Sequence, residues 1–266
     1  MNINTHTNIK EAKEAESCTV PAYVCLENIS LTLSEKSILK EVSFSLPATG
    51  ISSLIGPSGA GKSSLLRCLT NLYGNWQGVI SVAGVNTHSW LGGEDALRRH
   101  IGLIAQKPSV FPASIHDNVI FGLSRKERKQ DQSLRIEQCL KQAALWNEVK
   151  DRLHEAANTL SVGQQQRLCM ARALALEPKV LLLDEPTASL DPHSKQLIEA
   201  SLHDLAKEMP SLCVTHDLEQ AQRLQGQIIF MCDGKIIETA TVNDFFQSPK
   251  RLETREFLRW SVCDCD

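Results

Sequence analysis

Short apolar stretches separated by polar turns recur along the chain, and their spacing changes from one region to the next. Apolar and polar residues alternate within 22–55, which predicts an antiparallel layer, and a further strand is predicted near 79–82. Residues 180–183 are all apolar, as in a strand buried on both faces of a parallel sheet. From about 113 to 176 the apolar residues follow a helical spacing, which predicts an inserted helical subdomain.

The two ends of the chain differ from this middle part. Residues 1–17 are polar and charged and lack the apolar segment of a signal peptide, so we expect a flexible N-terminal extension over 1–21. Near the other end, Asp233-Gly234 predicts a hairpin turn, followed by one or two short helices. The sequence contains no internal repeat. We therefore expect one α/β domain over 22–249, with a C-terminal helix and tail over 250–266.

The most specific chemical signal is a glycine-rich segment between a strand-like run and a helix-like run. In such a loop the backbone N–H groups and the helix N-terminus face phosphates, the lysine reaches the β- and γ-phosphates, and the last residue ligates Mg²⁺. A glycine-rich turn before an ordinary core helix is the alternative, but the flanking strand and helix favour nucleotide binding. The segment matches G-x-x-x-x-G-K-[ST] in full and comprises Gly56, Pro57, Ser58, Gly59, Ala60, Gly61, Lys62 and Ser63, with Ser64 next along the helix.

Two adjacent carboxylates, Asp184 and Glu185, end the apolar stretch 180–183. Ligands of open α/β sheets collect at the carboxyl ends of the strands, so both side chains are expected near the phosphates. Asp184 would hold Mg²⁺ through its water shell, and Glu185 would act as the base that polarises the attacking water. Two acidic residues after a strand also occur in ordinary polar loops, but the upstream phosphate-binding segment favours the catalytic interpretation.

Residues 160–167 read Leu-Ser-Val-Gly-Gln-Gln-Gln-Arg and resemble the L-S-G-G-Q signature of ATP-binding cassette (ABC) ATPases. The resemblance implies that Ser161 and Gly163 contact the γ-phosphate bound by the opposite subunit, and that Gln164 belongs to the same nucleotide site. The helix-like run that follows would direct its free N–H groups at this anion. Val162 replaces the first glycine of the pair, and a branched residue cannot adopt the φ > 0 conformations open to glycine. We therefore expect Val162 to alter the usual geometry of this loop slightly.

Three further landmarks of the ABC family are present in the expected order. Gln106 follows an apolar run and matches the Q-loop glutamine, which in the family contacts Mg²⁺ and the attacking water. Asp191, in Ser189-Leu190-Asp191, matches the D-loop, and His216 matches the switch histidine that contacts the γ-phosphate. Each has an ordinary structural alternative. Gln106 could be a polar residue at a strand end, Asp191 the N-cap of a helix that begins at Pro192, and His216 a capped core histidine.

The resemblance covers about 25–247 and implies an α/β fold: an ABC-type P-loop NTPase with a RecA-like mixed sheet, an antiparallel β layer and an inserted α-helical subdomain. It also implies that one chain carries half of each active site. Two copies would then face each other head to tail as an ATP-bound homodimer, which hydrolysis releases. The implied cofactors are ATP and Mg²⁺, the catalytic residues Glu185, His216 and Gln106, and the metal ligands Ser63, Gln106 and Asp184.

One feature of the family is missing from the sequence. The aromatic residue that stacks on adenine is expected near Leu33, and residues 31–34 contain no Tyr, Phe or Trp. Tyr23 is a substitute candidate, although ordinary packing at the start of a strand is the interpretation we favour. We therefore expect ATP to bind more weakly, or with looser base selectivity, than is usual for the family.

No apolar run approaches the roughly 18 residues that a membrane-spanning helix needs. A transport motor of this kind needs separate transmembrane permease subunits, and we expect it as a peripheral subunit on the cytoplasmic face of the inner (plasma) membrane. The net charge of −3 gives no electrostatic case for nucleic acid. The charged run 125–129 is interpreted as a solvated helix face. The cysteines are scattered and typical of small buried residues, and only Cys263 and Cys265 are closely paired.

Three segments, 106–119, 143–153 and 164–172, are similar to the ATP-binding subunits of phosphate importers. In that family the first segment borders the groove that receives a helix of the membrane subunit. The resemblance implies ATP hydrolysis coupled to import of inorganic phosphate, with permease subunits and, through them, a periplasmic or extracellular phosphate-binding protein as partners. The alternatives are an importer of another small anion or nutrient and a soluble ABC ATPase without a transport role. Such soluble proteins usually carry two cassettes or a long coiled coil, and this chain has neither.

Overall fold

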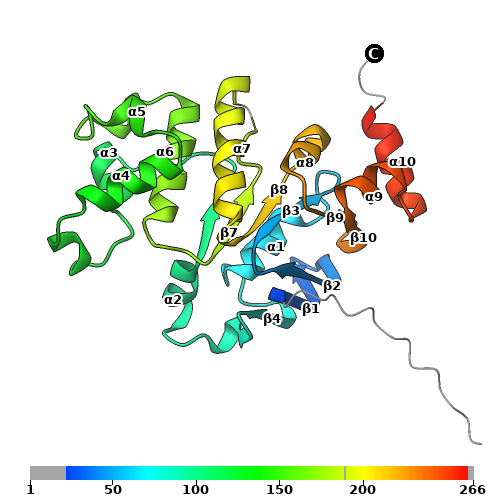
Figure 1. Cartoon of the computed structure of the whole chain (residues 1–266). Helices are drawn as coiled ribbons and strands as arrows, with labels where there is room; N and C mark the ends of the chain where they lie inside the picture. Colours follow the sequence, from blue (N-terminus) through cyan, green and yellow to red (C-terminus); the bar gives the residue numbers. More distant parts are fainter. Residues whose placement is uncertain (1–21, 189, 263–266) are drawn as a thin grey trace, which may run out of the picture.

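Two β-sheets and a group of helices make up the part of the chain that the computed structural model describes, residues 22–188 and 190–262 (Figure 1). The smaller sheet is antiparallel, with strand order β2-β1-β4-β5, and the larger sheet is mixed, with order β10-β9-β3-β8-β7-β6. Strands β9 through β6 of the larger sheet are parallel, and β10 pairs with β9 in the antiparallel sense. The mixed sheet and the antiparallel layer predicted from the sequence are therefore confirmed.

The strands alternate with helices along the sequence. The strands are β1 (Ala22–Leu33), β2 (Lys36–Pro47), β3 (Gly50–Ile55), β4 (Gln77–Val82), β5 (Val85–Asn86), β6 (Ile101–Ile104), β7 (Val180–Asp184), β8 (Pro210–Val214), β9 (Gln227–Cys232) and β10 (Lys235–Thr241). The α-helices are α1 (Lys62–Leu69), α2 (Gly93–His100), α3 (Ile115–Val119), α4 (Ser133–Gln142), α5 (Trp146–Val149), α6 (Val162–Leu174), α7 (Pro192–Ala206), α8 (Leu218–Leu224), α9 (Val242–Gln247) and α10 (Leu252–Val262). Short 3₁₀ turns lie at Thr87–Ser89, Glu127–Lys129 and Ala157–Thr159.

The larger sheet is covered on both faces, which explains why residues 180–183 of β7 are all apolar. Successive side chains of a strand point to opposite faces. Accordingly, Leu182 packs in a core cluster with the antiparallel sheet and α1, whereas Leu181 and Leu183 pack in a second cluster with α6 and α7. All three are fully buried. The continuous apolar run therefore reflects two separate cores, one on each side of the strand.

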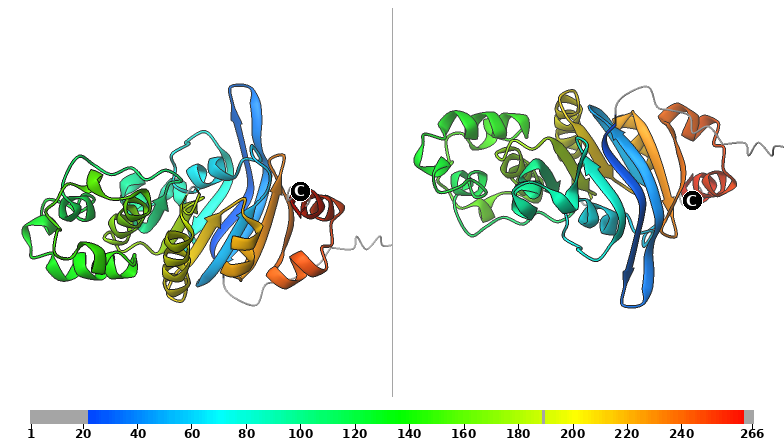
Figure 2. Two further views of the ribbon diagram at one scale, coloured as in Figure 1. Left: turned by 90° about the horizontal axis from the view of Figure 1, so that it is seen from above. Right: turned by 90° about the horizontal axis from the view of Figure 1, so that it is seen from below.

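Figure 2 shows the helices between residues 115 and 174 at one end of the molecule and α9 and α10 at the other. Within the helical end, α6 packs against α3, α4 and α7. The hairpin predicted at Asp233-Gly234 is present between β9 and β10, and both residues have positive φ angles of 45° and 76°. Among the residues that the structure describes, none of the helices combines the length and apolar character of a bilayer-spanning helix.

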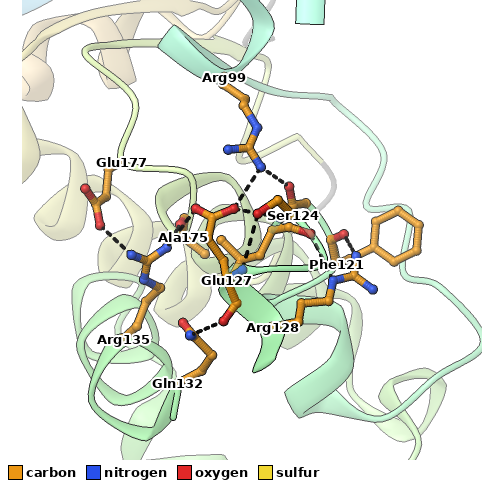
Figure 3. Close-up of polar contacts among 11 residues, drawn as sticks. Arg99, Phe121, Ser124, Glu127, Arg128, Gln132, Arg135, Ala175 and Glu177 are labelled. Atoms are coloured by element: carbon orange, nitrogen blue, oxygen red, sulfur yellow. Dashed lines mark hydrogen bonds and ion pairs between the residues drawn. The ribbon is translucent and has the colours of Figure 1, made fainter. Parts of the chain in front are cut away.

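The charged run 125–129 is exposed to solvent at four of its five residues, as expected, but it is not the face of an α-helix. Glu127–Lys129 forms one short 3₁₀ turn, and two of its charged side chains are held by contacts. Glu127 Oε2 accepts hydrogen bonds from Ser124 N (2.6 Å) and Arg99 Nη2 (3.3 Å), and Arg128 Nε donates to Leu123 O (3.0 Å) (Figure 3). The distribution of charge along five residues gave no hint of these partners, most of which lie outside the run.

Several of the predictions fall on residues outside the described part of the chain. These are the N-terminal extension 1–21, Ser189 of the D-loop, and the cysteine pair Cys263 and Cys265. Of the six cysteines within 22–188 and 190–262, four are buried, and burial raises the pKa of Cys68 to about 12 and of Cys139 to about 11. These thiols are small core residues, as the scattered spacing predicted.

Candidate active site

The glycine-rich segment forms the loop between β3 and α1. Gly56 has a φ of 151°, and a Cβ atom there would lie 1.9 Å from the carbonyl oxygen of Met231, so no other residue fits. Gly61 has a φ of 103°, and its Cβ would lie 3.0 Å from Ile38 O and from Leu39 Cδ2 of β2. The loop is therefore wrapped tightly against both sheets while Pro57, Ser58 and Gly59 remain exposed.

Lys62 places a buried cation inside this loop. Its Nζ donates hydrogen bonds to the carbonyl oxygens of Gly56 (2.7 Å) and Pro57 (2.9 Å), and the residue is only 6% exposed. Burial lowers the pKa of the Lys62 ammonium, and the nearby carboxylates of Glu185 and Asp184 act in the opposite direction. No side chain caps the N-terminus of α1, whose N-cap is Gly61. Its first-turn N–H groups and the ammonium together suit a phosphate group.

Asp184 ends β7 beside this loop. Ser63 Oγ, in the first turn of α1, donates a hydrogen bond to Asp184 Oδ1 over 2.9 Å. Burial raises the pKa of Asp184, the charge of Glu185 raises it further, and the hydrogen bond from Ser63 opposes the rise. A carboxylate and a hydroxyl are hard oxygen ligands, and a divalent cation would relieve the repulsion between the two carboxylates. These residues therefore fit a Mg²⁺ ion bound together with phosphates.

Glu185 lies at the centre of a polar cluster at the carboxyl ends of three adjacent strands. Glu185 Oε2 accepts a hydrogen bond from Gln106 Nε2 (2.8 Å) and lies 3.1 Å from His216 Nδ1. Gln106 follows β6, Glu185 follows β7 and His216 follows β8, so the parallel order of these strands brings the three side chains together. The φ angle of Glu185 is 48°, and its N–H donates to Val214 O over 2.9 Å. The backbone is thus held in a left-handed conformation that turns the side chain toward both neighbours.

A cleft of about 230 Å³ opens at this cluster. Gln106, Glu185 and His216 line it, together with Lys195 and Thr215. Thr215 Oγ1 accepts a hydrogen bond from the N–H of Asp217 (3.0 Å), which tightens the turn after His216. A carboxylate with room for a small molecule beside it, next to a phosphate-binding loop, has the arrangement needed to activate water.

The signature segment lies apart from this cluster, at the N-terminus of α6. Ser161 is the N-cap of that helix, and its φ and ψ angles are −62° and 161°. Ser161 Oγ accepts from the N–H of Gln164 (3.3 Å), and Gln164 Oε1 accepts from the N–H of Ser161 (2.9 Å), so a complete capping box is present. Val162 is the first helical residue and has no positive φ angle. Its side chain is simply exposed.

Gly163 explains how the signature helix and the D-loop fit together. A Cβ atom on Gly163 would lie 2.3 Å from Ser194 Oγ and 3.7 Å from Asp191 Oδ2, so glycine is required for the close contact with α7. Asp191 is the N-cap of α7, as the structural alternative proposed, and its Oδ1 accepts from the N–H of Ser194 over 3.0 Å. The capping role and a nucleotide role do not compete, because the second carboxylate oxygen is not used in the cap.

Tyr23 does not lie at the position of an adenine-stacking residue. Its ring stacks on His100, and its hydroxyl lies 3.2 Å from His100 Nε2. Leu33 is ten positions further along the same strand, which corresponds to about 33 Å of extended chain. Leu33 packs on the antiparallel sheet near the β1–β2 turn, and residues 38 and 39 beyond that turn touch the P-loop at Gly61. The interpretation of Tyr23 as a packing residue agrees with these contacts.

Sequence patterns missed two groups that connect the site. Gln166 Nε2 donates to Ala105 O over 3.0 Å, which joins α6 to the residue before Gln106. Glu148, on α5, receives a hydrogen bond from Gln164 Nε2 over 2.7 Å. Gln166 lies within the recognised signature segment. Its burial, which is unusual for a polar side chain, is the feature that would have distinguished it from its neighbours. Glu148 lies within the segment 143–153, but the sequence gives no sign of this contact, because its partner is 16 residues away in another helix.

A P-loop between β3 and α1, two carboxylates at the end of a central parallel strand and a capped second helix define a P-loop nucleotide-binding domain. Comparison with known proteins identifies the particular class. The family model described as ABC transporter matches residues 39–188, more than half of the chain, and the chain belongs to this family.

The curated relatives include two proteins named phosphate import ATP-binding protein PstB. One, from Pseudoalteromonas translucida, is 40% identical over 242 residues, which cover 88% of this chain and 87% of the relative. The other, numbered PstB 1 and from Streptococcus agalactiae, is 42% identical over 241 residues, which cover 88% and 95%.

Among solved structures, cbiO1 from Clostridium perfringens, described as part of the ABC transporter complex cbiONQ, aligns with a TM-score of 0.74 at 25% identity. That alignment covers 90% of this chain and 99% of cbiO1. A bacterial Atm1-family ABC exporter with ATP bound aligns with a TM-score of 0.80 at 24% identity, over 98% of this chain and 46% of the exporter chain. The second likeness concerns the fold alone.

Proposed function

We propose that this chain is the ATP-binding and ATP-hydrolysing motor subunit of an ABC importer for inorganic phosphate. The observation that carries the catalytic part is the convergence of Gln106 and His216 on one oxygen of Glu185, close to the P-loop. The names and extent of the relatives, at about 40% identity over nearly nine-tenths of the chain, support phosphate as the cargo.

The residues of the site divide the chemistry among them. The P-loop residues 56–63, with Ser64, hold the phosphates of ATP, and the Lys62 ammonium neutralises the β- and γ-phosphates. Glu185 accepts the proton of the attacking water, while Gln106 and His216 hold its carboxylate in place through Oε2. Ser63 and Asp184, with Gln106, would hold a Mg²⁺ ion, which would supply further charge neutralisation at the phosphates.

The active form in this proposal is a head-to-tail homodimer. Figures 1 and 2 have α6 toward the helical end of the molecule and α1 against the sheets, which favours use of the α6 N-terminus by a second copy. Ser161, Gly163 and Gln164 of each copy, with Asp191 nearby, then complete the nucleotide site of the other. The positive end of the α6 dipole suits the γ-phosphate. ATP binding closes this dimer and hydrolysis opens it.

The surface for the permease is a groove of about 330 Å³ beside β6. Phe111 and Phe121, whose ring centroids are 3.7 Å apart, give it an apolar wall, and Arg98, Arg99 and Arg172 line it as well. Arg99, on α2, donates a hydrogen bond to Glu127 Oε2 over 3.3 Å (Figure 3). Apolar surface edged by cations suits an amphipathic helix with acidic side chains. We infer that a helix of the membrane-spanning permease binds there, with a phosphate-binding protein reached through the permease.

Membrane association tests this docking surface. Phe121 is 47% exposed, and Phe121→Asp should prevent the chain from sedimenting with membranes that contain its permease, because a buried unpaired charge in the groove is costly. Leu134→Asp is the matched control, since Leu134 is 82% exposed on α4 and does not line the groove. Equal sedimentation of the two variants would contradict the assignment of the groove.

Phosphate uptake tests the function as a whole. Cells whose own importer ATPase has been deleted would receive this chain, its Glu185→Gln variant or a control variant, Glu208→Gln. Glu208 is exposed and lies just after α7. The proposal predicts that wild type and control restore uptake and that Glu185→Gln does not. Hydrolysis of ATP without any rescue of uptake would leave the catalytic assignment standing and contradict phosphate as the cargo.

A further inference from the structure

Both the oxygen and the nitrogen of the Gln164 side-chain amide form hydrogen bonds. Its Oε1 accepts from the N–H of Ser161 over 2.9 Å, and its Nε2 donates to Glu148 Oε2 over 2.7 Å. The first contact is half of the capping box at the start of α6, and the second leads away from the nucleotide site to α5. One side chain therefore connects the proposed γ-phosphate loop with a carboxylate in a neighbouring helix.

Glu148 determines which way this amide faces. An ionised carboxylate only accepts hydrogen bonds, so it selects the NH₂ end of Gln164. The amide oxygen must then point to the Ser161 N–H, which is the orientation that the capping box requires. In the reversed orientation the amide NH₂ would face a backbone N–H and its oxygen would face a carboxylate, which is unfavourable at both ends. The carboxylate thus specifies the cap through an intermediate side chain.

Glu148 is itself fixed by a buried cation. Arg167, on α6, is 3% exposed, and its Nη1 and Nη2 contact Glu148 Oε1 (2.5 Å) and Oε2 (3.3 Å). Arg167 Nη1 also donates to the carbonyl oxygen of Ala144, which precedes α5. Burial would raise the pKa of Glu148, but hydrogen bonds from Arg167 and Gln164 outweigh it and lower that pKa. The carboxylate is therefore ionised and has little freedom to move at neutral pH.

We propose that Glu148 is a positioning residue for ATP hydrolysis: through Gln164 it holds the Ser161 cap in the geometry that completes the active site of the opposite subunit. Ser161 Oγ uses a lone pair to accept from the Gln164 N–H, so its own O–H remains available to a phosphate oxygen. This inference rests on the head-to-tail dimer proposed above, because the effect of Glu148 is exerted on a nucleotide that its own P-loop does not bind.

The first test compares variants of Glu148. Glu148→Gln keeps the shape but can donate as well as accept, so it no longer selects one orientation of Gln164, and we expect kcat to fall about 5- to 30-fold with the KM for ATP unchanged. Glu148→Asp remains acceptor-only and should recover part of that loss. Glu155→Gln is the control, as Glu155 is an exposed acidic residue of the same region. Equal kcat values for Glu148→Gln and wild type would overturn the proposal.

Mixed dimers separate positioning from a general loss of folded protein. Two differently tagged full-length chains are purified as one ATP-bound dimer, and the first turnover of ATP is measured. With Glu148→Gln and Glu185→Gln in opposite subunits, one site keeps an intact P-loop half and an intact α6 half. With both changes in the same subunit, every site carries one defect. We expect the opposite-subunit arrangement to turn over ATP at the same rate as a dimer that carries only Glu185→Gln, in one subunit. The same-subunit arrangement should be about 5- to 30-fold slower.

Ser161→Ala in the same two arrangements shows which assumption has failed if the expectation is not met. If the turnover rate depends on the arrangement for Ser161→Ala but not for Glu148→Gln, Glu148 has only a structural role and the inference is wrong. If Ser161→Ala is also independent of the arrangement, the head-to-tail dimer is wrong, and the inference is overturned together with it. Glu148→Gln also removes the ion pair between Glu148 and Arg167. Thermal unfolding of each single variant shows whether loss of this pair affects the fold itself.

Discussion

Replacement of Glu185 by glutamine removes the proposed base and little else. Glutamine has the same shape, and its amide oxygen can still accept the hydrogen bond that Gln106 Nε2 donates. The charge of Glu185 contributes to the raised pKa of Asp184, so its removal favours ionisation of Asp184 and should not weaken binding of Mg²⁺ and ATP. The loss is therefore expected in kcat rather than in KM.

The expected size of the loss follows from the role assigned to this carboxylate. Removal of a positioned general base lowers rates by about 10²–10⁴, which corresponds to about 2.7–5.5 kcal/mol of barrier. Phosphate release at saturating ATP measures kcat, and size-exclusion chromatography with ATP measures the dimer, which should accumulate because it is no longer opened by hydrolysis. A Glu185→Gln variant with kcat within about tenfold of wild type would refute the assignment of the base.

Three further changes test separate parts of the account. Val162→Gly should lower stability by up to about 1 kcal/mol in thermal unfolding, because Val162 is an unstrained helical residue, and a rise in Tm would show that it is strained. Leu33→Tyr should lower the Kd for ATP about 5- to 150-fold by stacking on adenine, and an unaltered Kd in calorimetry would contradict the position inferred for the base. Hydrogen bonds from Ser124 hold the pKa of Glu127 at about 2, so its stabilising effect is complete above about pH 4.5 and is lost as the pH falls toward 2. In urea unfolding, Glu127→Gln should be less stable than wild type at pH 7, by under about 1 kcal/mol because the carboxylate is partly exposed. The two free energies of unfolding should converge near pH 2, and a difference that stays constant with pH would contradict this.

The framework of the site could be predicted from sequence because its signals are local. The P-loop glycines, the apolar strand before Asp184 and the cap at Asp191 each depend on a few consecutive residues, and the structure has the P-loop between β3 and α1 and the carboxylates at the end of β7 as expected. Their order along the chain was enough to bring Gln106, Glu185 and His216 to one edge of the sheet. That these residues bind and hydrolyse ATP stays a prediction.

The parts that sequence did not reveal depend on contacts between distant segments. Glu148 meets Gln164 and Arg167 across two helices, and Arg99 meets Glu127 across 28 residues. Val162 is the first residue of α6 and has no positive φ angle, so this position needs no glycine, and the effect expected on the usual geometry of the loop stays a prediction. Propensity alone does not set the exact start of a helix; the capping box at Ser161 does.

ATP-driven phosphate transport by the assembled complex tests the central claim most directly. The chain would be purified with its permease, reconstituted into vesicles with ATP on the side of this subunit, and supplied with the phosphate-binding protein and labelled phosphate on the other side. We predict that labelled phosphate crosses the membrane only with ATP, that sulfate does not compete, and that Glu185→Gln abolishes the flux while Glu208→Gln preserves it. Phosphate flux that is the same with Glu185→Gln as with wild type, or ATP hydrolysis without any phosphate flux, would contradict the account.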